Sequence, residues 1–253
     1  MFSFKQGIPI GIIKHGRDRN RILRIVGDDS KKSKQDMIEF ISDPDSISPM
    51  MSVDERTVAY IGAPSGAGKS TVASNLIRNW IKTHNPDEVY IISRSDYRDD
   101  KAFEGLNLKQ IKITTKLIEN PIDITNMVQG DTLMVFDDIG TIQEKKLKEA
   151  VEKLICDILE TGRKYKIWVI VTNHLLIPQD KKFARCMLNE MQSLYVFPRA
   201  GGKQQIRYIL KTYYGMDKDQ INEIVERTNR WVRIEKTYPQ FVMTDDEAYL
   251  INS

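Results

Sequence analysis

Cysteine, histidine and long apolar runs are scarce in this sequence, and each shortage excludes a class of protein. The chain of 253 residues has two cysteines and three histidines. Cys156 and Cys186 have no Cys or His at metal-ligand spacing, which predicts reduced core thiols and no structural zinc site. Apolar runs such as 133–136 and 167–171 hold four or five residues, whereas a membrane-spanning helix needs about 20. We therefore expect a soluble chain without a membrane span.

The N-terminal part of the chain carries no motif that indicates a function. Residues 1–13 mix Lys5 with short apolar pieces and lack the continuous apolar core and cleavage site of a signal peptide, so we expect none. Strand-like pieces at 8–13 and 22–26, a helix at 34–41 and a loop at 43–50 follow from the local pattern. We interpret residues 1–53 as an N-terminal extension of unknown role and residues 54–253 as one domain.

From residue 57 onward, strand and helix patterns alternate. Strands are predicted at 57–62, 88–93, 110–113, 132–137 and 167–172, and helices at 69–82 and 143–159. Further on we expect helices at 180–191, 204–214 and 218–228, and strands at 193–197, 230–234 and 241–243. Near-continuous Val, Ile, Leu and Phe in the strands, separated by amphipathic helices, is typical of a parallel sheet buried on both faces. The predicted fold class is therefore α/β, with a mainly parallel central sheet flanked by helices.

The segment between the strand at 57–62 and the helix at 69–82 has the phosphate-loop pattern. Small residues allow the backbone N–H groups to converge on phosphate oxygens, and the helix that follows adds its positive N-terminal end. Lys69 is predicted to reach the β- and γ-phosphates and Ser70 to place its hydroxyl on Mg²⁺. The predicted nucleotide-binding residues are Ala63, Pro64, Ser65, Gly66, Ala67, Gly68, Lys69, Ser70 and Thr71.

Two carboxylates, Asp137 and Asp138, end the apolar strand that lies 68 residues beyond the lysine. In a nucleoside triphosphatase, the first of two such acids holds Mg²⁺ and the second polarises the attacking water. We assign the metal role to Asp137 and the general-base role to Asp138. A doubled acid favours hydrolysis over transfer to a small acceptor, because only hydrolysis needs a base for water.

The strand at 167–172 also ends in polar residues, Thr172, Asn173 and His174. Polar groups at the carboxyl end of a buried parallel strand lie beside a bound nucleotide. Either Thr172 or Asn173 is a candidate to contact the γ-phosphate or the attacking water, and we favour Asn173. His174 is interpreted as a loop histidine, because Asp138 already fills the role of base. No Asn-Lys-x-Asp tetrad that would read guanine is present, so ATP is the expected nucleotide.

Positive charge is concentrated in one segment. Residues 163–211 hold ten Lys or Arg and only two acids, although the whole chain has a net charge of +3. Such an asymmetry is compatible with a surface that faces a polyanion and also with a solvated basic face that has no partner. The basic residues are Arg163, Lys164, Lys166, Lys181, Lys182, Arg185, Arg199, Lys203, Arg207 and Lys211.

Three of these features together resemble the genome-packaging ATPases of large double-stranded DNA viruses, the poxvirus type within the FtsK/HerA group of ring-forming translocases. They are the phosphate loop with its proline, the strand ending in Asp137 and Asp138, and Gly162-Arg163-Lys164-Tyr165-Lys166 before a strand with a polar end. The resemblance spans residues 57–214. Lys164 and Asn173 depart from the Gly-Arg-His and the strand-end Gln that this family often has.

The resemblance implies a P-loop fold of the additional-strand, RecA/FtsK-like type and an ATP-hydrolysing translocase that packages viral genomic DNA into the capsid. The implied cofactors are ATP and Mg²⁺. The implied partners are double-stranded DNA, further copies of the chain in a ring, and capsid or portal proteins, in the virion or the cytoplasm of the infected host cell. A neighbouring subunit would lend an arginine to the γ-phosphate; Arg163 is the first candidate, with Arg185 and Arg199 in reserve.

Two other functions use the same phosphate loop. A nucleotide or small-molecule kinase would clamp phosphates with arginines such as Arg94, Arg98 and Arg163, but the adjacent acids and the lack of an arginine-rich lid argue against it. A loader or switch protein would bind ATP, turn it over rarely and act on a protein partner. Strong stimulation of hydrolysis by DNA would separate the translocase from the switch, and phosphate release without an acceptor would exclude the kinase.

Overall fold

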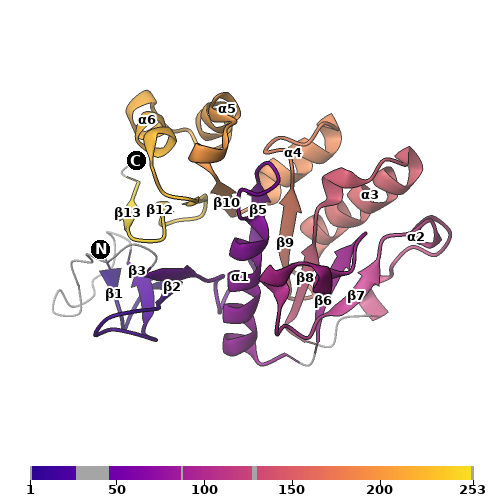
Figure 1. Ribbon diagram of the computed structural model, residues 1–253, viewed down its shortest axis with the longest axis horizontal. Coiled ribbons are helices and arrows are strands. Elements are labelled where there is room, and N and C mark those ends of the chain that lie inside the picture. Colours follow the sequence, from indigo (N-terminus) through magenta and orange to yellow (C-terminus); the bar gives the residue numbers. More distant parts are fainter. Residues whose placement is uncertain (1, 27–45, 87, 127–129, 252–253) are drawn as a thin grey trace.

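The N-terminal part of the chain forms a small antiparallel sheet of its own (Figure 1). The computed structural model describes residues 2–26, 46–86, 88–126 and 130–251, so the helix predicted at 34–41 lies outside the described residues. The strands of this sheet, in spatial order, are β1 (Phe2–Ser3), β3 (Ile22–Ile25), β2 (Ile8–Ile13) and β4 (Ile47–Pro49). The loop predicted at 43–50 is wrong where β4 forms. Ser and Pro favour a turn there, but the backbone pairs with Gly11–Ile13 of β2.

A nine-stranded sheet forms the centre of the molecule, with the order β13-β12-β11-β10-β5-β9-β8-β6-β7. The six strands from β10 to β7 pair in parallel, whereas β11, β12 and β13 continue the sheet in antiparallel pairs. The strands are β5 (Val58–Gly62), β6 (Val89–Ser93), β7 (Lys109–Lys112), β8 (Thr132–Phe136), β9 (Ile167–Asn173), β10 (Ser193–Val196), β11 (Val232–Glu235), β12 (Phe241–Met243) and β13 (Ala248–Leu250).

Strand β9 lies between β5, which leads into the phosphate loop, and β8, which ends before the two acids. Gly62 at the end of β5 pairs with Asn173, and Phe136 at the end of β8 pairs with Val171. This inserted strand is the additional strand that the sequence resemblance implied, and the predicted fold class is confirmed. Because all three strands are parallel, their carboxyl ends meet at one edge of the sheet.

Helices cover both faces of the parallel part of the sheet (Figure 1). Alternate side chains of β5 point to opposite faces: Ala59 and Ile61 share a buried cluster with α1, whereas Val58 and Tyr60 share the other with α3 to α6. The α-helices are α1 (Lys69–His84), α2 (Lys116–Glu119), α3 (Lys145–Thr161), α4 (Lys181–Glu190), α5 (Lys203–Tyr213) and α6 (Lys218–Glu226). Single 3₁₀ turns are η2 (Tyr97–Asp99), η3 (Lys101–Phe103), η4 (Ile124–Asn126), η5 (Ile139–Thr141) and η6 (Pro198–Ala200).

The N-terminal sheet shares its core with the α1 face of the large sheet. Ile10, Leu23 and Met51 belong to the same buried cluster as Ile61 and Trp80. The boundary after residue 53 stays a prediction, but the residues before it pack as part of the same core. None of the helices in the described ranges combines the length and apolar character that a membrane span requires.

The two cysteines lie on facing helices, Cys156 on α3 and Cys186 on α4. Both are free and half-buried, and both pack against the same hydrophobic cluster. Their reduced state stays a prediction. A hydrogen bond between the two thiols raises the pKa of Cys156. Their proximity has no counterpart in the sequence, where 30 residues separate them.

Candidate active site

The phosphate loop connects β5 to α1 at the edge where the parallel strands end. Gly66 and Gly68 have φ angles of 77° and 111°, a backbone region that residues with a Cβ rarely adopt. The Ala67 N–H donates to the Pro64 carbonyl at 3.4 Å, which closes the turn. A Cβ on Gly62 would lie 2.8 Å from the Cα of Leu176, so glycine there permits close packing of the loop against the segment after β9.

Lys69 folds back over this loop. Its side chain is 7% exposed, and its Nζ donates to the Pro64 carbonyl at 3.4 Å. The same Nζ lies 3.8 Å from Oδ1 of Asp138, the second of the two acids. Lys69 and Asp138 therefore lie close together in the fold, although 69 residues separate them in sequence.

Thr172, at the end of β9, holds the two acids in place. Its hydroxyl donates to Oδ1 of Asp137 at 2.7 Å and accepts from the backbone N–H of Asp138 at 2.8 Å. Thr172 is fully buried. The residue that we ranked second as a contact to the nucleotide is thus committed to positioning the carboxylates.

Asp137 follows β8 directly and is half-buried. Its pKa is raised to about 6, mainly because burial disfavours the charged carboxylate; the charges of Asp138 and Asp100 contribute to the rise, while the Thr172 hydrogen bond and Lys69 act in the opposite direction. A buried carboxylate destabilised in this way gains from a nearby cation. This is the electrostatic setting that a metal-binding acid needs.

Asp138 occupies a left-handed backbone conformation with φ 49° and ψ 43°, which few residues other than glycine adopt. The turn directs its carboxylate between Lys69 and His174, whose Nε2 lies 3.4 Å from Oδ2. Oδ1 is buried and accepts no hydrogen bond from the described residues. Such an oxygen can accept a proton from water or face a hydrated cation. Our interpretation of His174 missed this contact with Asp138.

Asn173 lies between the acids and the phosphate loop. Its backbone carbonyl accepts from the Ala63 N–H at 3.1 Å, and its side-chain Oδ1 accepts from the Leu175 N–H at 3.4 Å. A Cβ on Gly140 would come within 2.3 Å of the same Oδ1, so the turn after Asp138 passes directly over the amide. Asn173 is 4% exposed and sits where the strand ends, as the sequence indicated.

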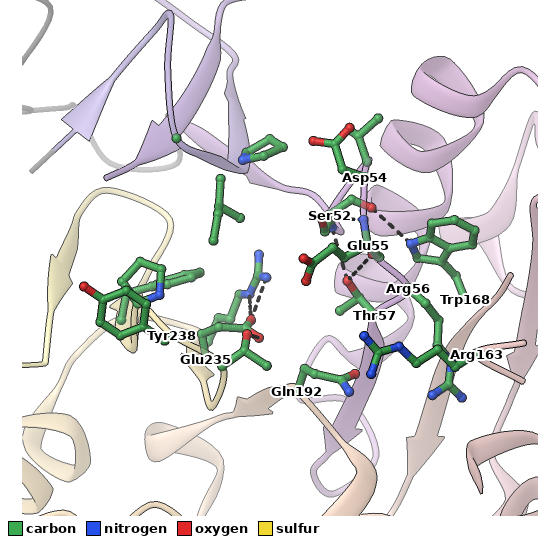
Figure 2. A pocket seen from close by; sticks show the side chains of 18 of the residues that line it. Ser52, Asp54, Glu55, Arg56, Thr57, Arg163, Trp168, Gln192, Glu235 and Tyr238 are labelled. Atoms are coloured by element: carbon green, nitrogen blue, oxygen red, sulfur yellow. Dashed lines mark hydrogen bonds and ion pairs between the residues drawn. The ribbon is translucent and has the colours of Figure 1, made fainter. Parts of the chain in front are cut away.

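Arg163 lies apart from these groups within the chain. It precedes β9, and because β9 runs parallel to β5, Arg163 is at the edge of the sheet opposite the phosphate loop. There it lines a cavity of about 570 Å³ beside Arg56 (Figure 2). Arg199, a reserve candidate, follows β10 on the phosphate-loop edge, where its Nη1 donates to the Thr228 carbonyl at 3.2 Å. The catalytic role of each arginine stays a prediction.

Arg230 contacts the phosphate loop, and sequence reasoning missed it. Its Nε donates to the Ala67 carbonyl at 3.1 Å across 163 residues of chain. A Cβ on Gly68 would be 2.7 Å from the same Nε, so the guanidinium lies against the glycine of the loop. No signal in the sequence identifies this arginine, because the contact depends on how β11 joins the sheet.

The basic segment is distributed over several elements. Residues 163–166 form the turn before β9, whereas α4 and α5 follow β9 and β10 and begin toward the phosphate-loop edge. Lys181, Lys182 and Lys203, in the first turns of the two helices, are exposed. In the part of the chain that the structure describes, no group of three or more His, Cys, Asp or Glu could hold a metal ion by itself.

Comparison with known proteins gives one viral relative. No family model matches the chain. Uncharacterized protein V3 of Sputnik virophage is 36% identical over 262 residues, which covers 98% of this chain and 99% of that protein. A match of this extent spans nearly the whole chain, the N-terminal part included.

Three solved structures are similar in architecture. The cytoplasmic domain of the type VII secretion ATPase EccC of Thermomonospora curvata has a TM-score of 0.52 and 11% identity, covering 93% of this chain but only 28% of EccC. The pCW3 conjugation coupling protein TcpA, with ATPγS, has a TM-score of 0.52 and 12% identity, covering 97% of this chain and 78% of TcpA. The genome packaging NTPase B204 of Sulfolobus turreted icosahedral virus 2, with ATPγS, has a TM-score of 0.47 and 9% identity over 74% of this chain and 95% of B204. The likeness to EccC and TcpA supports the P-loop ATPase fold.

Proposed function

Since the chain belongs to the same family as protein V3 of Sputnik virophage, we propose that it is an ATP-driven DNA translocase that packages viral genomic DNA into the capsid as a homo-oligomeric ring. The observation that carries the ATPase part is the meeting of the phosphate-loop lysine and the second acid, with Lys69 Nζ 3.8 Å from Asp138 Oδ1. The viral relative and the ATPase fold shared with TcpA, a coupling protein solved with ATPγS, support the wider proposal.

In the proposed reaction, the backbone N–H groups of the loop and Lys69 bind the triphosphate. Asp138 accepts a proton from the attacking water, and His174 beside it stabilises the carboxylate. Asn173, between the loop and the acids, orients the water or the γ-phosphate. Thr172 keeps both carboxylates at the end of the sheet, so the base does not drift from the phosphate.

The residues present fit a magnesium ion that arrives with the nucleotide. Asp138 Oδ1 is a buried oxygen without a hydrogen-bond donor among the described residues, and Asp137 is a carboxylate whose charge burial disfavours. Ser70 and Asp137 would hold the ion, because Mg²⁺ prefers one or two protein oxygens in addition to phosphates and water. The ion would neutralise charge that develops on the phosphates.

Hydrolysis at the proposed site is completed by an arginine from a neighbouring subunit, and Arg163 remains the first candidate. Its position at the opposite edge of the sheet prevents it from reaching the phosphate loop of its own chain. The exposed lysines of α4 and α5 are proposed to contact the phosphates of double-stranded DNA. Capsid or portal proteins are the proposed partners in the virion or the infected cell.

The test is the rate of phosphate release from Mg·ATP, with and without double-stranded DNA, at several protein concentrations. We expect DNA to stimulate the rate, the specific activity to rise with concentration, and Lys69→Ala to abolish both binding and hydrolysis. Lys82→Ala is a matched control, because Lys82 lies on the same helix and is exposed. Turnover that is unchanged in Lys69→Ala would refute the ATP site, and a rate indifferent to DNA would refute the translocase.

A further inference from the structure

The positions of the acids impose a direction on ATP in the proposed site. The γ-phosphate must face Asp138 and Asn173, which follow β8 and β9 on one side of the phosphate loop. In the sheet order β11-β10-β5-β9-β8, the strands β10 and β11 lie on the other side. Resting on the proposed function, we propose that the ribose and base of ATP bind on this β10–β11 side, between Arg230 of the C-terminal part and Lys14 of the N-terminal sheet.

Arg230 is at this place because β11 runs antiparallel to β10. Val232 pairs with Val196, the last residue of β10, so β11 begins at the edge where the phosphate loop lies. The preceding residue, Trp231, is buried against Tyr195 and anchors the start of the strand. The exposed Arg230 then reaches the loop, where its Nε contacts the Ala67 carbonyl. Its remaining N–H groups make no ion pair or hydrogen bond with other described residues.

A small cavity of about 90 Å³ lies next to the Arg230 guanidinium and borders the phosphate loop. Gly68, Thr71 and Asn75 line it from the loop and from α1, and Arg230 lines it from the C-terminal part. Thr71 follows Ser70 directly and is exposed. A triphosphate that runs from Asp138 across the loop toward Thr71 therefore ends at this cavity, where its nucleoside must continue.

The N-terminal sheet closes the same cavity with Lys14. The Lys14 N–H donates to the Ser46 carbonyl at 2.8 Å, and the Ile47 N–H donates to the Asp245 carbonyl at 2.9 Å. The first bond joins the end of β2 to the start of β4, and the second holds β4 against the C-terminal part. Asp245 also lines the cavity. The N-terminal residues, which carry no motif, thus contribute directly to the nucleotide site.

The chemistry of these side chains fits a nucleoside. A planar guanidinium can stack on the face of an aromatic base, where the π-system attracts its positive charge. The Lys14 ammonium and the Asn75 amide can donate to ribose hydroxyls or ring nitrogens. Arg230 and Lys14 are therefore expected to strengthen the binding of ATP but not that of a ligand that has only the phosphates.

The test compares the Kd of Mg·ATP with that of Mg·tripolyphosphate by titration calorimetry, in the full chain and in the variants Arg230→Ala and Lys14→Ala. Each variant should raise the Kd of Mg·ATP about tenfold and change the Kd of Mg·tripolyphosphate less than twofold. Arg230→Lys should also bind ATP more weakly than the wild type, because lysine cannot stack on the base. Arg17→Ala, in the turn between β2 and β3 and exposed, is the matched control and should change neither Kd.

The outcomes distinguish this inference from the proposed function. If ATP binds each variant as tightly as it binds the wild type, or if tripolyphosphate weakens in parallel, the nucleoside does not contact these residues and the inference is wrong while the ATP site stands. If the wild type binds neither ligand, the ATP site itself is refuted and the inference with it. Melting temperatures within 2 °C of the wild type, measured for each variant, would exclude misfolding as the cause.

Discussion

At the scale of single residues, Thr172 links the two acids of the site. One buried hydroxyl bonds both Asp137 and the backbone of Asp138, and the second acid adopts a left-handed turn that leaves its carboxylate beside Lys69. The two acids thereby acquire different environments: burial raises the pKa of Asp137, whereas the side chain of Asp138 is 43% exposed. Different environments permit the two different roles assigned to them.

Asp138→Asn is expected to separate binding from hydrolysis. The amide keeps the size of the side chain but cannot accept a proton from water, so kcat should fall by roughly 10² or more. Binding of Mg·ATP should stay within a few fold of the wild type, because Lys69 and the loop remain. Phosphate release and titration calorimetry measure the two effects. A silent Asp138→Asn together with an inactive Asp137→Asn would show that the base assignment is wrong.

The raised pKa of Asp137 predicts a pH dependence of stability in the absence of nucleotide and Mg²⁺. Between pH 3.8 and about 6, the folded chain keeps this proton and the unfolded chain releases it, so stability falls as the pH rises through that window. Asp137→Asn has no proton to lose there. Relative to the wild type, its free energy of unfolding should therefore gain about 2 kcal/mol between pH 4.5 and pH 7.5.

Urea unfolding of the two proteins at pH 4.5 and pH 7.5 measures this difference, with the exposed Asp99→Asn as control. A wild-type chain that gains stability against Asp137→Asn as the pH rises would contradict the burial of this carboxylate. At pH 7.5, adding Mg·ATP should stabilise the wild type more than Asp137→Asn, because Mg²⁺ favours the charged form of the Asp137 carboxylate.

At the scale of elements, the N-terminal sheet is fastened to the large sheet through β11. Arg233 is buried and forms an ion pair with Glu235, with Nη2 2.8 Å from Oε2. Its Nη1 also donates to the carbonyls of Ile10 and Met50, which belong to the N-terminal part. A single side chain thus satisfies two backbone acceptors from distant segments and compensates the buried carboxylate.

Removing this side chain should destabilise the whole protein. Arg233→Ala leaves the buried Glu235 without its cation and removes the hydrogen bonds to the carbonyls of Ile10 and Met50, so the free energy of unfolding should fall by about 3–5 kcal/mol. Replacing both members of the pair by methionine should recover part of the loss, because no unpaired charge then remains buried. Urea unfolding is the measurement and Arg17→Ala the control. A loss under 1 kcal/mol in Arg233→Ala would mean that the N-terminal sheet is not held through this pair.

At the scale of the whole molecule, the two ends of the parallel strands carry different functional groups. The phosphate loop, the acids and the start of α5 lie at the edge where the parallel strands end, whereas Arg163 precedes β9 at the other edge. There it lines the cavity that Figure 2 shows. A ring built from such a subunit can complete a site only if the Arg163 edge of one copy approaches the loop edge of the next. The proposed role of Arg163 can therefore be tested only in the oligomer.

Mixing two inactive variants tests that arrangement. Arg163→Ala should bind ATP and fail to hydrolyse it, and Lys69→Ala should do neither. A mixture of the two should regain activity at interfaces that pair an intact loop with an intact arginine, since the arginine contributes roughly 10³ to 10⁵ in rate. Arg185→Ala and Arg199→Ala, taken through the same assay, cover the reserve candidates. A concentration-independent rate from a monomer would refute the shared site.

The exposed lysines of α4 and α5 predict a salt dependence of DNA binding. Lysines that contact phosphates release counterions, so log K for duplex DNA should fall with log salt at a slope of about −0.9 per contact. Neutralising Lys181, Lys182 and Lys203 together should make the slope shallower by up to about 3 units and leave ATP binding intact. A triple variant with the wild-type slope would identify these lysines as a solvated face.

Much of this arrangement was predictable from local sequence. The phosphate loop, the strand ending in Asp137 and Asp138, and the polar end of β9 are contiguous patterns, and each strand and helix predicted from residue 57 onward is found within a few residues of its expected ends. The short strands β1, β4 and β13 escaped prediction because backbone pairing with distant residues defines them, rather than their own periodicity.

The sequence by itself determined the chemistry of the site, because the phosphate loop and the acids consist of neighbouring residues whose spacing already imposes their local geometry. Only the tertiary structure decided which side chains meet: that Thr172 fixes the acids, that His174 contacts Asp138, that Arg163 stands at the far edge, and that Arg230 lies on the phosphate loop. Strand order and burial set these contacts across tens to hundreds of residues. No local pattern encodes such distances, because they are the outcome of packing the whole core at once.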